Sequence, residues 1–90
     1  MFKMEAKWDG KKLVLRLSGR MQTPQVEQLE SWINNAVRSI ALDLEEVRLV
    51  DLDVVRFLST CEAQGIELQH CAAYIREWIR REGARQDRNF

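Results

Sequence analysis

Hydrophobic and polar residues alternate along four short stretches of the chain, and a period of two predicts half-buried strands. These stretches span residues 1–9, 12–18, 39–44 and 66–70. Asp9-Gly10 predicts a hairpin turn of type I′ between the first two strands, and Gly19 is expected to end the second. The inward-facing positions predicted in the four strands are Phe2, Met4, Ala6 and Trp8; Leu13, Leu15 and Leu17; Ile40, Leu42 and Leu44; and Ile66, Leu68 and His70.

Three other segments repeat their hydrophobic residues at the spacing of an amphipathic helix. They run from Thr23 to about Arg38, from Asp51 to Gly65, and from about Ala72 to Glu82. Thr23 and Asp51 are expected N-caps, because their side-chain oxygens can accept a hydrogen bond from a free amide of the first turn. Gly65 and Gly83 are expected to end the second and third helices. The predicted buried stripes are Val26, Leu29, Ile33, Ala36 and Val37; Val54, Val55, Leu58 and Cys61; and Ile75, Trp78 and Ile79.

The strand pattern also predicts how the helices cover the sheet. Strands buried on both faces would be almost continuously apolar, whereas all four stretches here alternate, so helices are expected on one face only. The fold class predicted is α/β: a small two-layer domain with a four-stranded mixed sheet and about three helices on one face. Residues 45–48 form an acidic link between the third strand and the second helix. A single domain should span residues 1–90, with 84–90 as a frayed tail.

Composition and charge exclude several classes of protein. The 90 residues carry 14 basic and 14 acidic side chains, so no net field favours nucleic acid or a membrane surface. No apolar run approaches the ~20 residues of a spanning helix, and the start of the chain lacks the apolar core of a signal peptide. We therefore expect a cytoplasmic protein without membrane insertion. The basic C-terminal residues are interpreted as a solvated helix face rather than a nucleic-acid site: Arg76, Arg80, Arg81, Arg85 and Arg88.

Few residues offer catalytic or metal-binding chemistry. The chain has one histidine, His70, and two cysteines, Cys71 and Cys61. Together they could supply three ligands to a metal, but no Cys-x-x-Cys spacing accompanies them. We interpret them as structural residues and predict neither a cofactor nor an enzyme, while a metal-binding or ligand-binding domain using these three residues is kept as an alternative. The phosphate-binding glycine loop and the nucleophile elbow are both missing.

The segment from Leu42 to Leu68 resembles the core of a STAS domain. A strand leads to Val50-Asp51, a helix follows, and Gly65 precedes the next strand. The upstream stretch Leu13–Arg20 fits as well, since such domains carry a strand that ends in a glycine before the first helix. The resemblance covers residues 11–82. It implies a protein-interaction module of the kind found in anti-sigma-factor antagonists, or a small STAS subunit of a lipid transporter complex.

The chain departs from this family at one position. STAS antagonists carry Asp-Ser-Ser-Gly or Asp-Ser-Thr-Gly where the loop enters the helix, and a kinase phosphorylates the first hydroxyl residue. The same place here reads Asp51-Leu52-Asp53-Val54, so Leu52 stands at the phosphoacceptor position without a hydroxyl. We predict that Asp51, Leu52, Asp53 and Arg56 bind a protein partner, with Leu52 as an exposed apolar contact. The partners that the resemblance implies are an anti-sigma kinase, another STAS protein or a transporter ATPase, and a second copy of the chain is a further candidate.

Overall fold

The computed structural model describes residues 2–35 and 39–87, in which strands and helices form one mixed sheet with helices packed on it. The elements follow the chain in this order: β1 (Lys3–Trp8), β2 (Leu13–Met21), α1 (Thr23–Asn34), β3 (Ile40–Val50), α2 (Leu52–Ala63), β4 (Glu67–Gln69) and α3 (Ala73–Asp87). The predicted α/β class, with a four-stranded mixed sheet and three helices, is confirmed.

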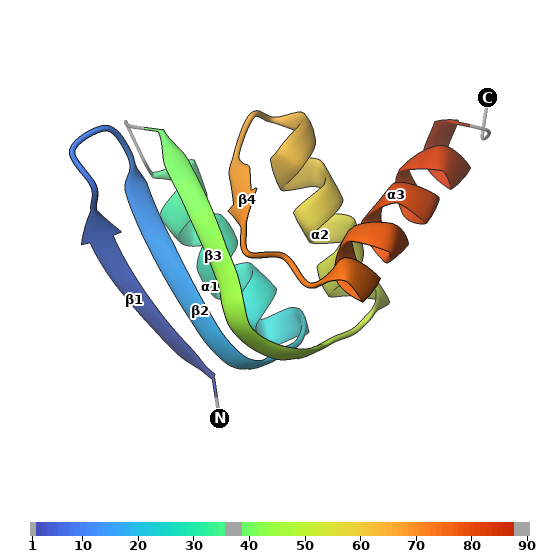
Figure 1. Cartoon of the computed structure of the whole chain (residues 1–90), viewed down its shortest axis with the longest axis horizontal. Helices are drawn as coiled ribbons and strands as arrows, with labels where there is room; N and C mark the ends of the chain where they lie inside the picture. Colours follow the sequence, from blue (N-terminus) through green and yellow to red (C-terminus); the bar gives the residue numbers. More distant parts are fainter. Residues whose placement is uncertain (1, 36–38, 88–90) are drawn as a thin grey trace.

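The strands lie in the sheet in the order in which they occur along the chain, β1-β2-β3-β4 (Figure 1). β1 and β2 form an antiparallel hairpin, while β2–β3 and β3–β4 are parallel pairs joined through α1 and α2. This arrangement places β1 at one edge of the sheet and the three-residue β4 at the other. The connection from β3 through α2 to β4 is the predicted succession of a strand, a helix and a second strand, and it forms a βαβ unit.

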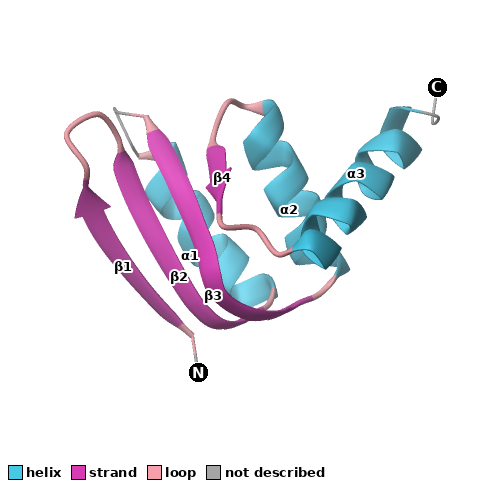
Figure 2. Cartoon of the chain, in the orientation of Figure 1, coloured by secondary structure: helices cyan, strands magenta, loops and turns pink. Residues whose placement is uncertain are grey.

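The helices differ in how they meet the sheet (Figure 2). α1 lies behind β2 and β3 in this view and runs alongside them, and α2 packs beside both α1 and β4. α3 packs against the outer side of α2. Two ion pairs join these helices, one between Arg56 and Glu82 and one between Glu62 and Arg76.

The core forms between the sheet and the helices, and it contains most of the residues predicted to be inside. Leu15, Leu17, Leu42 and Leu44 are at most 1% exposed. The helical stripes contribute Val26, Leu29, Val54, Val55, Leu58, Cys61, Ile75 and Ile79, all buried. Alternation along β2 and β3 therefore identifies the inner face of these two strands correctly. The predicted stripe residues Ala36 and Val37, and the predicted helix end at Arg38, lie outside the described residues.

Two strands are longer than predicted. β2 does not end at Gly19: that residue takes a φ of +96°, and the strand continues to Met21, whose side chain is fully buried. Residues 45–48, predicted as an acidic link, are part of β3. The two extensions pair with each other after register shifts near Ser18 and Gly19. The end of β2 and the second half of β3 pair with each other, so each is a strand because the other is there. The sequence of either segment by itself does not show this pairing.

Three residues on β1 and β3 differ in burial from the predicted pattern. Ala6 and Trp8 are exposed although they were predicted to face inward, because β1 is an edge strand that the helices only partly cover. Ala41 lies between the predicted inward residues Ile40 and Leu42, so alternation places it outward, yet it is fully buried. It lies on β3 between the neighbouring strands, and the Lys12–Glu67 ion pair reaches across that position. A methyl group there is small enough to be covered.

The turn between β1 and β2 and the N-cap of α1 both differ from the prediction. The hairpin after β1 is present, but only Gly10 has a positive φ, so a type I′ turn does not form. The Asp9 carboxylate accepts hydrogen bonds from the amides of Lys11 and Lys12, which lowers the pKa of Asp9 below its usual value. α1 begins one residue earlier than predicted, with Gln22 rather than Thr23 as its N-cap.

The third helix is longer than predicted. It passes through Gly83 and extends to Asp87, so Gly83 is not its stop and residues 84–87 are helical. Glu82 is only 4% exposed and lies against α2, and it holds the helix in place just before the glycine. Because Glu82 is held against α2, the turn before Gly83 is stabilised, and the helix does not need to end where the sequence first permits it.

Candidate functional site

The start of α2 is built by a local signal that the sequence shows. Asp51 has extended backbone angles, and its Oδ1 accepts a hydrogen bond of 2.9 Å from the amide of Val54. This is the predicted N-cap. Val54 and Val55 then turn into the core, which leaves Asp51, Leu52 and Asp53 on the surface.

Two of the predicted partner-binding residues lie side by side at this helix start. Leu52 is the first residue of α2, and 38% of it is exposed, as predicted for an apolar contact. Asp53 follows in the first turn, where its negative charge complements the positive end of the helix dipole. Its Oδ2 accepts a hydrogen bond of 3.2 Å from the hydroxyl of Thr23. Thr23 therefore joins the starts of α1 and α2, and no pattern in the sequence predicts this contact.

The fourth predicted residue, Arg56, has a structural partner. Its Nε donates to Oε1 of Glu82 on α3 at 3.3 Å. About half of the Arg56 side chain remains exposed, whereas the Glu82 side chain is only 5% exposed. Arg56 thus connects the candidate surface to α3 while part of its guanidinium group still faces solvent.

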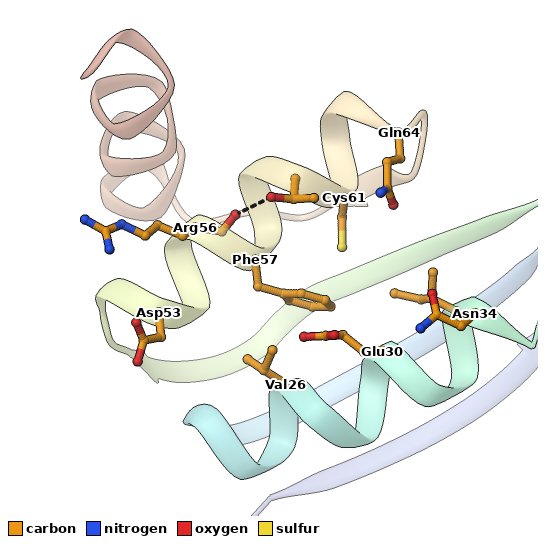
Figure 3. A pocket seen from close by; sticks show the side chains of 10 residues that line it. Val26, Glu30, Asn34, Asp53, Arg56, Phe57, Cys61 and Gln64 are labelled. Atoms are coloured by element: carbon orange, nitrogen blue, oxygen red, sulfur yellow. Dashed lines mark hydrogen bonds between the residues drawn. The ribbon is translucent and has the colours of Figure 1, made fainter. Parts of the chain in front are cut away.

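A shallow hollow of about 390 Å³ continues from this surface between α1 and α2 (Figure 3). Phe57 points from α2 toward α1 and faces Val26 and Glu30 across the hollow. Asp53 and Arg56 lie at the end nearest the start of α2. The hollow combines an apolar floor with charged residues at its rim, which is a common arrangement at protein interfaces.

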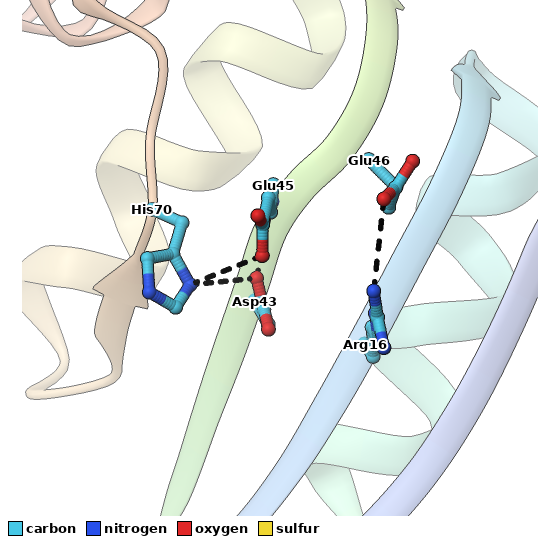
Figure 4. A network of polar contacts seen from close by, with 5 residues as sticks. All are labelled: Arg16, Asp43, Glu45, Glu46 and His70. Carbon is cyan, nitrogen blue, oxygen red and sulfur yellow. Dashed lines mark hydrogen bonds and ion pairs between the residues drawn. The ribbon is translucent and has the colours of Figure 1, made fainter.

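His70 occupies a different place from the one predicted. It was expected to point inward, but it has a φ of +53° and its ring turns over the outer face of the sheet toward β3 (Figure 4). Its Nδ1 lies 3.1 Å from Oδ1 of Asp43 and 3.9 Å from Oε2 of Glu45. The change to a left-handed conformation ends the alternation of β4. The rule that every second residue faces inward therefore does not apply to His70.

The alternative site of His70 with two cysteines does not form among the described residues. The groups there that could hold a metal comprise only Asp43, Glu45 and His70. Cys61 lies in the core, where burial raises the pKa of its thiol to about 12, and burial also raises the pKa of Cys71. Both thiols therefore keep their protons at neutral pH.

The carboxylates beside His70 were missed because their partner lies 25 or more residues away along the chain. Asp43 and Glu45 are two positions apart on β3, so their side chains point to the same face of the sheet. Burial acts to raise the pKa of Asp43, but hydrogen bonds from the Glu45 amide and His70 outweigh it, and the pKa is lowered. The i, i+2 spacing of two carboxylates was the one available signal.

Comparison with known proteins identifies the fold through structure rather than sequence. No protein-family model matches the sequence, and no curated protein matches it. Among solved structures, the crystal structure of Mglu superposes on 72% of this chain with a TM-score of 0.53 and 18% identity. This chain spans 18% of the length of that protein.

In a second solved structure, most of the other protein's length is covered by this chain. The antisigma-factor antagonist STAS domain from Rhodobacter sphaeroides superposes on 76% of this chain, with a TM-score of 0.54 and 18% identity, and 83% of that domain is covered. The chain has a STAS-like fold. Within this STAS-like fold, the unit from β3 through α2 to β4 is the part that the sequence resemblance rests on, and Leu52 is the first residue of its helix.

One further property concerns membranes. In residues 2–35 and 39–87, no helix combines the length and the apolar character that crossing a bilayer would require.

Proposed function

We propose that this domain is a non-enzymatic protein-interaction module of STAS type that acts in bacterial regulatory signalling in the cytoplasm. It binds its partner through the start of α2, with Leu52 as the apolar contact and Asp51 and Asp53 as flanking charges. Arg56 contributes from the next turn. The partner is a kinase, a second STAS protein or a transporter ATPase, as the family resemblance implies.

The observation that supports this proposal most directly is the exposure of Leu52 within a STAS-like fold. A leucine that is 38% exposed and is flanked by two carboxylates offers an apolar anchor inside a polar rim. The hollow between α1 and α2, which Asp53 and Arg56 also line, adds the partly buried Phe57 as a second apolar contact. A partner that fits would present a hydrophobic side chain together with lysine or arginine.

The absence of a hydroxyl at Leu52 determines how the module would be regulated. A leucine cannot be phosphorylated, so association at this surface does not switch with phosphate at this position. Asp53 does not replace the phosphate, since it lies one position further on and carries about one negative charge rather than about two. The proposed module is therefore constitutively competent to bind at this surface.

A pull-down from the lysate of the source cell tests the proposal. The wild-type domain is expected to capture a signalling protein or transporter subunit, and Asp53→Lys is expected to lose it, because the change reverses the charge at the centre of the surface. Leu52→Asp should weaken capture as well, since it replaces the apolar anchor with a charge. Bound proteins are identified by mass spectrometry and affinity is measured with the purified partner.

Glu5→Lys is the matched control. Glu5 is an exposed carboxylate on β1, at the sheet edge far from α2, and the substitution changes net charge by the same amount. Capture should be unchanged in this variant. Equal capture by the wild type, Asp53→Lys and Leu52→Asp would place the interaction on another surface and contradict the proposal.

A further inference from the structure

Asp43, Glu45 and His70 form a cluster on the outer face of the sheet, away from the proposed partner surface (Figure 4). Their ligand atoms, two carboxylate oxygens and the Nδ1 of the imidazole, all lie within 4.8 Å of one another. Two come from β3, and the third comes from the residue that follows β4. The fold therefore converges three side chains of metal-ligating type on one point.

Two of the three distances within the cluster lie close to those that a small cation would need. Zinc binds imidazole nitrogen and carboxylate oxygen at about 2.1 Å, so two ligands in tetrahedral geometry lie about 3.4 Å apart. Nδ1 of His70 lies 3.1 Å from Oδ1 of Asp43 and 3.9 Å from Oε2 of Glu45. These two values lie on either side of the ideal separation, so small side-chain rotations are sufficient.

The surroundings hold the ligands in place and leave the charge of the cluster intact. Oδ1 of Asp43 accepts a hydrogen bond of 3.1 Å from the amide of Glu45, an outer contact of the kind that orients ligating carboxylates. Arg16 is the cation nearest to Asp43 on β2, and it pairs with Glu46 at 3.6 Å. With a neutral imidazole, the three ligands carry two negative charges, which match a divalent ion.

We infer that Asp43, Glu45 and His70 form a binding site for a divalent transition-metal ion of the zinc type, with solvent completing its coordination. The imidazole nitrogen favours zinc, cobalt or nickel over magnesium and calcium, which prefer all-oxygen sites. The bound ion would join β3 to the connection between β4 and α3. β4 is a three-residue edge strand, so this clamp would stabilise the weakest part of the sheet.

Zinc titration of the purified, tag-free domain after dialysis against a chelator tests the inference. Calorimetry at pH 7.5 should give one equivalent of bound Zn²⁺ per chain, and zinc should raise the melting temperature. His70→Ala and Glu45→Gln should each weaken binding at least about tenfold, since each removes a ligand.

Glu27→Gln is the matched control, because Glu27 is an exposed carboxylate on α1 that lies outside the cluster. It should bind zinc like the wild type, and so should Cys71→Ser. Glu45 is largely exposed, so Glu45→Gln keeps the test decisive even if His70→Ala were to unfold. No zinc binding by the wild type, or equal binding by Glu45→Gln and the wild type, would overturn the inference. Loss of binding in Cys71→Ser would overturn it as well.

Discussion

The units β3–α2 and β4–α3 are both a strand followed by a helix. Their strand–helix junctions are nevertheless determined in different ways. In the first, Asp51 caps the helix and Gly65, with a φ of +90°, ends it. In the second, His70 turns the chain in a left-handed conformation and the helix runs through Gly83. The first junction follows from neighbouring residues, whereas the second depends on contacts between segments far apart in sequence.

The difference shows why the second unit resists prediction from the sequence. Left-handed φ is uncommon for residues other than glycine, so nothing in the sequence marks His70 as a turning point. Its ring meets Asp43 of β3, and α3 meets α2 through Arg56–Glu82 and Glu62–Arg76. The β4–α3 unit is thus positioned by the β3–α2 unit that precedes it.

The largest loss of stability should come from truncation of Ile75, which packs α3 against the core. Ile75 is fully buried on α3, so Ile75→Ala leaves a cavity where α3 meets the core. We expect a loss of about 2–5 kcal/mol in the free energy of unfolding. Urea denaturation followed by circular dichroism measures it.

The neighbouring Tyr74 provides the control. It is 54% exposed, and its hydroxyl donates a hydrogen bond of 3.3 Å to the carbonyl of Arg48. Tyr74→Phe removes only that exposed contact and should cost less than about 1 kcal/mol. Equal effects of the two substitutions would mean that α3 is not packed through Ile75.

Elements that follow from a local sequence pattern could be predicted. Elements that form only because two strands pair with each other could not. The inner residues of β3, the cap at Asp51 and the stop at Gly65 were all predicted. The acidic residues 45–48 gave no strand signal, because their strand conformation comes from pairing with the end of β2. In the candidate sites, the exposure of Leu52 followed from the helical stripe. The cluster around His70 required knowledge of which side chains the sheet brings together.

A substitution at His70 should have an intermediate effect and tests the left-handed junction. His70→Val places a β-branched residue at a φ of +53°. We expect it to lower the free energy of unfolding by about 1–2 kcal/mol through backbone strain, measured by urea denaturation with a chelator present.

His70→Asn separates the backbone from the side chain at this junction. Asparagine tolerates a left-handed conformation, so the variant loses the imidazole without the strain. It should therefore be more stable than His70→Val. If both variants lost the same stability, the contacts of the ring rather than the backbone would determine the stability at this junction.

The smallest effects should come from the two glycines, and they should have opposite signs. Gly65 has a φ of +90° with open space around its Cα, so Gly65→Ala meets no neighbour and costs only backbone strain. We expect a loss of about 1 kcal/mol. Gly83 lies within α3, where alanine is the better helix former, and Gly83→Ala should gain about 0.5–1 kcal/mol.

Space at Gly83 decides the sign of that gain. A methyl group there would approach only Ser59 Oγ, at 4.0 Å, which is an ordinary contact and no clash. The same substitution should thus destabilise one predicted helix stop and stabilise the other, with melting curves of the two variants shifting in opposite directions. If Gly83→Ala also destabilised the domain, α3 would end at Gly83 in solution. The sequence pattern would then describe the β4–α3 unit as well as it describes β3–α2.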